Sequence, residues 1–158
     1  MKWYDLLITD EFIDYFSNDN SIYYTDFKNR VEYTPQPIFK KFIDTVIGIT
    51  YVSAKFDDDF MQHSSVKQAE PDIYSAYTLC KQSVSHDFNL SDIWQSMKLE
   101  ETIFSPYEIE IETLNAEQLA HLIIYPFWNR TGGSWEIEFL ESGRLKKYLL
   151  ELKKKAHR

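Results

Sequence analysis

A strict alternation of glutamate with large apolar residues occupies positions 107 to 112, which read Tyr-Glu-Ile-Glu-Ile-Glu. Successive side chains of a β-strand point to opposite faces, so this pattern predicts a strand with one apolar face and one acidic face. The same alternation returns in residues 134 to 140, Ser-Trp-Glu-Ile-Glu-Phe-Leu. These two segments predict a small sheet in the C-terminal third of the chain.

Helical patterns accompany the two predicted strands. Residues 115 to 125 carry helical spacing, with Asn115 as the expected N-cap and Pro126 as the expected end. A last helix is expected after Ser142, because apolar residues there follow the i, i+3, i+4, i+7 spacing of a buried stripe: Leu145, Tyr148, Leu149 and Leu152. The C-terminal third is therefore predicted to run β-α-β-α.

The first hundred residues are expected to be mainly helical. Amphipathic spacing predicts helices over residues 3–17, 38–52, 71–80 and 91–99, although the second one is rich in β-branched residues beyond Gly48. Residues 21–33 permit either a short strand or an ordered loop. The predicted fold class is α+β, with a mainly helical N-terminal two-thirds and a small C-terminal sheet. At 158 residues, we expect a single domain over residues 1–158.

Charge is unevenly distributed along the chain. Residues 144–158 hold seven Lys or Arg and one Glu, a net charge of +6, whereas the whole chain carries -8. Residues 1–143 therefore carry -14. Such an acidic body repels nucleic acid and attracts basic partners. We expect a basic protein partner and no nucleic acid.

The glutamates of the two predicted strands share one sheet face, on which like charges are unfavourable. This set consists of Glu108, Glu110, Glu112, Glu136 and Glu138. Three interpretations stay open. The face is solvated and partly neutralised by the basic C-terminal segment, or it binds a basic partner, or its carboxylates converge on a hard cation.

Other candidate contacts lie in two short segments. Asp57, Asp58 and Asp59 form a second acidic patch, without the spaced oxygens of a calcium loop. The segment from Trp128 to Arg130 precedes a Gly-Gly turn and carries residue types that are enriched at interface hot spots.

Catalytic signatures are missing from the sequence. His121 lies within an apolar helix, and a packed role suits it better than that of a base. Cys80 suits a small buried hydrophobe and, as the single cysteine, excludes an internal disulfide. The chain has no phosphate-binding loop, nucleophile elbow or metal-ligand motif. We therefore expect a protein that is not an enzyme and that uses no metal or cofactor.

The expected compartment is the cytoplasm. The N-terminal segment is interrupted by Asp5, Asp10, Glu11 and Asp14, so it does not match a secretion signal. No run approaches the roughly 18 apolar residues that a membrane span needs. We expect no contact with a membrane, and the sequence leaves the oligomeric state open.

Taken together, the size, the acidic body, the aromatic residues, Cys80 and the two Glu-rich segments resemble those of small acidic bacterial immunity proteins, which neutralise toxins of competing cells. The resemblance implies binding to a basic toxin domain, such as a nuclease, through carboxylates that take the place of phosphates. It carries over no functional residue. The candidate partner contacts are Glu108, Glu110, Glu112, Glu136, Glu138, Asp57, Asp58, Asp59, Trp128 and Arg130. The alternatives are a metal-dependent hydrolase that uses the same glutamates and a non-catalytic adaptor protein.

Overall fold

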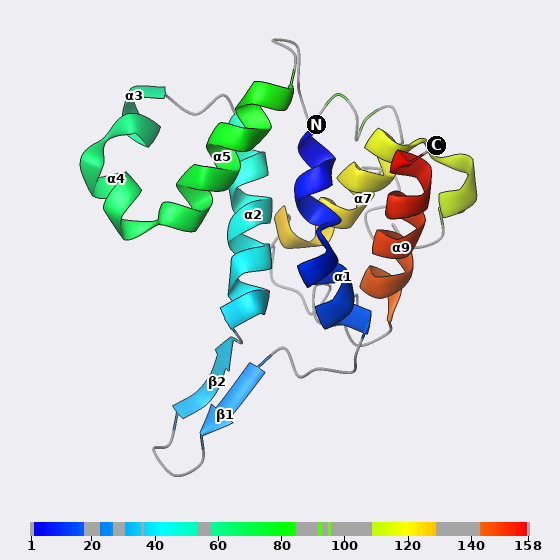
Figure 1. The fold of residues 1–158 in the computed structure, drawn as a ribbon, viewed down its shortest axis with the longest axis horizontal. Coiled ribbons are helices and arrows are strands. Elements are labelled where there is room, and N and C mark those ends of the chain that lie inside the picture. The colour runs from blue at the N-terminus through cyan, green and yellow to red at the C-terminus, as the bar shows by residue number, and fades with distance from the viewer. Residues whose placement is uncertain are drawn as a thin grey trace.

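The protein is a body of packed helices from which one β-hairpin projects (Figure 1). The computed structural model describes residues 2–17, 23–26, 31–35, 37–53, 58–84, 92, 95, 109–128 and 143–157. Its elements follow one another as η1 (Trp3–Leu7), α1 (Asp10–Ser17), β1 (Tyr23–Asp26), β2 (Val31–Pro35), α2 (Pro37–Ser53), α3 (Asp58–Gln62), α4 (Ser64–Ala69), α5 (Pro71–Ser83), η3 (Ile111–Thr113), α7 (Ala116–Trp128) and α9 (Arg144–Ala156).

The body is all-helical, so the predicted α+β fold with a C-terminal sheet is wrong. Ile111–Thr113 is a turn of 3-10 helix in the segment where a strand was predicted. The carbonyl oxygen of Glu110 accepts from both the N–H and the hydroxyl of Thr113, at 3.1 and 2.7 Å. These local bonds replace the ladder that a strand would need from a partner. The second predicted strand, residues 134–140, lies outside the described residues.

The two described apolar positions of the first alternating segment, Ile109 and Ile111, nevertheless face inward. Ile111 is buried and Ile109 packs at the edge of the main core. A 3-10 turn brings them there without strand geometry. The alternation therefore predicted that these side chains face the core, but it did not predict the 3-10 conformation of the backbone.

Several predicted helices are confirmed, with shifted ends. The segment 3–17 is divided at Ile8 and Thr9 into η1 and α1. The β-branched half of the segment 38–52 is helical in α2, because burial of its apolar face outweighs a small difference in propensity. In the segment 91–99 the structure describes only Asp92 and Gln95, and both are helical.

One predicted helix end is confirmed and two are wrong. Asn115 caps α7 as expected, with reciprocal bonds of 2.8 and 3.0 Å between Asn115 and Gln118. However, α7 continues through Pro126 to Trp128. The N-cap of α9 is Gly143 instead of Ser142, and its φ of +77° is a conformation that glycine adopts at little cost.

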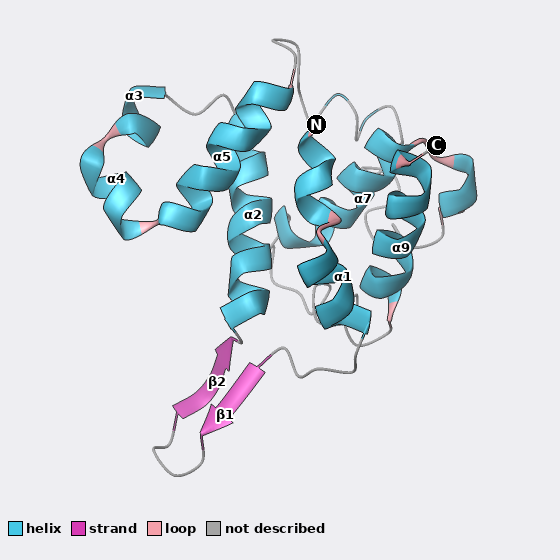
Figure 2. Ribbon diagram, viewed as in Figure 1, coloured by secondary structure: helices cyan, strands magenta, loops and turns pink. Residues whose placement is uncertain are grey.

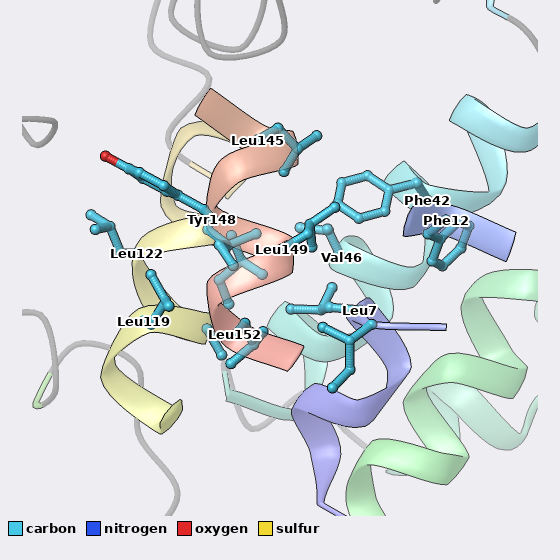
Figure 3. Close-up of a cluster of buried hydrophobic side chains, with 14 of the residues drawn as sticks. Leu7, Phe12, Phe42, Val46, Leu119, Leu122, Leu145, Tyr148, Leu149 and Leu152 are labelled. Atoms are coloured by element: carbon cyan, nitrogen blue, oxygen red, sulfur yellow. The ribbon is translucent and has the colours of Figure 1, made fainter. Parts of the chain in front are cut away.

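The main core lies between α9, α7 and the N-terminal helices (Figure 3). The apolar stripe of α9 supplies Leu145, Tyr148, Leu149 and Leu152, all buried as the spacing predicts. Leu7, Phe12 and Phe42 meet this stripe from η1, α1 and α2. The core thus joins both ends of the described chain.

A second, smaller core lies between α2, α3 and α5. Met61, Ile73 and Tyr77 are buried there, and Val52 of α2 packs against both this cluster and the main core. Helix α2 crosses α5 at Gly48. A Cβ atom at this position would lie 2.8 Å from Ala76 Cβ and 2.8 Å from the carbonyl oxygen of Ile73. Only glycine permits so close a contact.

The hairpin of β1 and β2 resolves the ambiguity of residues 21–33 in favour of strand. The two strands are antiparallel, with Tyr23 opposite Pro35 and Tyr24 opposite Thr34, and an irregularity follows Tyr24. Figure 2 shows that the hairpin extends from the N-terminal end of α2, away from the helices. It is the only sheet among the described residues.

Candidate partner-binding surface

Two of the predicted contact residues, Glu110 and Glu112, lie at the turn that precedes α7. Both side chains are exposed, on either side of the buried Ile111. The turn owes its form to the same Ile111, which anchors it in the core while the neighbouring carboxylates stay in water. This turn therefore presents two carboxylates on either side of a buried anchor.

The fold brings two further carboxylates together at the start of α7. The ring of Trp3 packs edge-on against His121 of α7, with centroids 4.8 Å apart, and this contact ties η1 to the first turns of α7. Burial raises the pKa of Tyr4, and the charges of Asp5 and Glu117 raise it further. Asp5 and Glu117 thus lie near one hydroxyl. We call Asp5, Glu110, Glu112 and Glu117 the acidic edge.

The basic C-terminal helix packs beside this edge. Lys155 Nζ donates to the Glu112 carbonyl oxygen at 3.3 Å. Burial raises the pKa of Tyr148 in α9, Arg144 opposes the shift, and the Glu112 carboxylate adds to it. Lys153 also pairs with Asp10 at 3.2 Å. The basic segment is therefore docked on the body, and part of the acidic charge is neutralised within the molecule.

The other predicted contacts that the structure describes do not join the acidic edge. Asp58 and Asp59 lie in α3, on the side of α5 away from α7 and α9 (Figure 1). Trp128 is the last residue of α7. Glu108, Glu136, Glu138, Asp57 and Arg130 lie outside the described residues. The described contacts thus fall into at least two separate surfaces.

The two side chains with possible catalytic chemistry are both buried. His121 Nδ1–H donates to the Glu117 carbonyl oxygen at 2.7 Å, and burial lowers the pKa of His121 to about 4. Burial raises the pKa of the Cys80 thiol to about 12. A neutral imidazole and a protonated thiol inside the core suit packing, which agrees with the interpretation drawn from the sequence.

No group of three or more His, Cys, Asp or Glu side chains among the described residues could hold a metal ion. Within this part of the chain, no helix has the length and apolar character to cross a membrane.

A cleft of about 150 Å³ was not predicted from the sequence. It lies where η1 and α1 meet α2 and α5, and its lining comes from three separate segments: Leu6, Thr9, Glu11, Phe12, Lys41, Thr45, Asp72, Ser75, Ala76 and Leu79. No local pattern connects these segments, so only the packing of the helices could reveal it.

Comparison with known proteins gives no relative: no family model, no curated protein and no solved structure matches this chain.

Proposed function

We propose that this protein is a cytoplasmic immunity protein that binds a basic toxin domain, with a nuclease domain as the first class to test. The acidic edge is the observation that supports this proposal. It presents Glu110, Glu112 and Glu117 to solvent from one end of the helical body, with Asp5 beside them.

The position of these carboxylates suits recognition. Glu110 and Glu112 make no ion pair with any residue that the structure describes, so a basic partner need not break one. Charges of one sign on one surface accelerate the encounter with a partner of opposite sign. A nuclease domain carries such a basic surface for phosphates, and carboxylates can occupy it.

The acidic edge replaces the sheet face that the sequence predicted. Glu110 and Glu112 remain candidate contacts, while Asp5 and Glu117 are new ones. The metal-dependent alternative needs converging ligands, and no observation on the described residues favours it. Binding of a partner is therefore the proposed function.

A charge-reversal experiment tests the proposal. The tagged protein is used to capture a basic partner from extract of its own cells at low salt, and the identified partner is then purified and titrated. Glu110→Lys with Glu112→Lys should weaken binding at least tenfold at low salt. The control is Asp14→Lys with Asp92→Lys, which alters the net charge equally at exposed sites outside the edge.

An immunity protein must also neutralise the toxin that it binds. The wild-type protein should suppress the toxicity or nuclease activity of the captured partner, and the edge variant should lose that suppression in proportion to its affinity. If the two double variants weakened partner binding equally, net charge alone would explain the effect. That result would contradict a specific binding site. Capture of no basic protein at low salt would overturn the proposal.

A further inference from the structure

The cleft between η1, α1, α2 and α5 is separate from the acidic edge and combines apolar walls with a charged rim. Its walls include Leu6, Phe12, Ala76 and Leu79. Leu79 is 39% exposed although it belongs to a well-packed helix, and Phe12 below is only 2% exposed. The apolar walls of the cleft are therefore exposed to solvent, and the cleft is large enough to hold a side chain.

The rim carries more negative than positive charge. Glu11 and Lys41 face each other across it and form an ion pair of 3.0 Å. The third charged group is Asp72, in the first turn of α5. Asp72 makes no ion pair with any described residue.

The ammonium group of Lys40, on which the charge of Asp72 also acts, is committed elsewhere. Lys40 donates to Asp44 at 2.7 Å, and this bond is the main reason why the pKa of Lys40 is raised, with Asp72 contributing from a distance. The Asp72 carboxylate therefore remains available to a ligand that enters the cleft.

We infer that this cleft receives an arginine side chain of the basic partner. The methylene stem would lie against Leu6, Ala76 and Leu79, and the guanidinium group would bond to Asp72 at the rim. This inference rests on the proposed function, because it names an anchor within the same kind of partner.

Arginine fits this lining better than the other candidate groups. Its stem covers apolar surface while its head stays at the rim, and its planar fork matches a carboxylate. A purely apolar side chain would leave Asp72 unused. An anionic ligand would meet two carboxylates against one ammonium group. Arginine is also a frequent hot-spot residue at protein interfaces.

The first test uses N-acetylarginine amide as the probe, followed by NMR of the backbone amides. Saturable shifts are expected at amides of Thr9, Ser75, Ala76 and Leu79. N-acetylcitrulline amide, which has nearly the same shape without the charge, should bind at least fivefold more weakly. Equal binding of the two probes, or arginine shifts confined to the acidic edge, would overturn the inference.

Three variants locate the site. Asp72→Asn should weaken probe binding at least fivefold. Lys41→Met should strengthen it severalfold, because it removes a like charge and releases Glu11 from its ion pair. Glu151→Gln, in α9 and outside both the cleft and the acidic edge, should leave it unchanged. For each variant, the amide signals of residues outside the cleft report whether the protein is folded. If neither Asp72→Asn nor Lys41→Met altered the affinity for the probe, the assignment would be contradicted.

The captured partner separates this inference from the proposed function. Loss of the partner with Glu110→Lys and Glu112→Lys, but unchanged affinity with Asp72→Asn, would overturn the arginine site and leave the proposed function intact. Binding of arginine in the cleft without any basic partner would instead contradict the proposed function.

Discussion

His121 illustrates how one side chain can link packing to pH. It is fully buried against Trp3, and its imidazole donates to the carbonyl oxygen of Glu117. Burial disfavours the charged form, which lowers its pKa from 6.5 to about 4. The residue therefore stays neutral in the folded protein over a pH range in which the unfolded chain would bind a proton.

The protein should become less stable as the pH falls from 6.5 toward 4. In that window the unfolded state takes up a proton at His121 and the folded state does not, so stability is fully present above pH 6.5 and is lost progressively below it. The loss from this residue should be about 2 kcal/mol at pH 5, from 1.36 kcal/mol per pKa unit. Urea unfolding at pH 7 and at pH 5 measures this difference in the free energy of unfolding.

Two histidine variants identify the source of this pH dependence. His121→Gln keeps a hydrogen-bond donor without a titrating ring, so its stability should vary much less between pH 7 and pH 5. His157→Gln removes an exposed histidine and should behave like the wild type. An unchanged slope in His121→Gln would mean that carboxylates dominate this window.

Helices α2 and α5 pack closely at Gly48, where the side chain of any other residue would meet α5. Gly48→Ala should destabilise the protein by about 1–3 kcal/mol, as overpacked cores do. The reason is that the new Cβ atom would lie 2.8 to 2.9 Å from Ala76, Ile73 and Tyr77. This cost should exceed the gain of roughly 1 kcal/mol that alanine brings to a helix. Denaturant unfolding measures the change.

The control is a glycine that is required for a different reason. Gly143→Ala meets no described atom within 4 Å but keeps a positive φ, so it should cost only about 1 kcal/mol through backbone strain. A Gly48→Ala protein as stable as the wild type would show that the two helices can separate at little cost.

Attachment of α9 should depend on its apolar stripe and much less on its lysines. Leu149 is buried, so Leu149→Ala should cost about 2–5 kcal/mol. The ion pair of Lys153 with Asp10 is exposed, and Lys153→Ala should cost less than about 1 kcal/mol. Denaturant midpoints of the two variants provide the comparison, and equal losses would contradict it.

At the scale of the whole molecule, the two hydrophobic clusters should unfold together. Val52 packs against both, and α2 spans them. Met61→Ala in the small cluster and Leu149→Ala in the main core should each shift one common transition. Helix circular dichroism and tryptophan fluorescence should report the same midpoint. Two separate transitions would mean that the unit of α3, α4 and α5 unfolds independently and would contradict the expected single domain.

Local patterns in the sequence predicted the features that depend on near neighbours. The stripe from Leu145 to Leu152 predicted the buried face of α9, and Asn115 predicted the start of α7. Hydrogen bonds in a helix connect residues four apart, so these signals are complete within a short segment. The charges of Glu110 and Glu112 could be recognised as a candidate contact for the same reason.

Features that join distant segments could not be predicted in this way. A strand needs a partner, and around Ile111 the local bonds to the Glu110 carbonyl oxygen prevailed instead. The acidic edge gained Asp5 and Glu117 only because Trp3 packs on His121.

The sequence by itself determined the buried stripe of α9, where charge accumulates and where most helices run, because periodicity and charge are local properties. Only the tertiary structure decided that the fold is helical, that α9 docks on the acidic body, and that Asp72 and Leu79 face Leu6 across a cleft. The physical reason is that these arrangements depend on non-local packing. The sum of many small contacts between segments selects one packing, and no single segment encodes it.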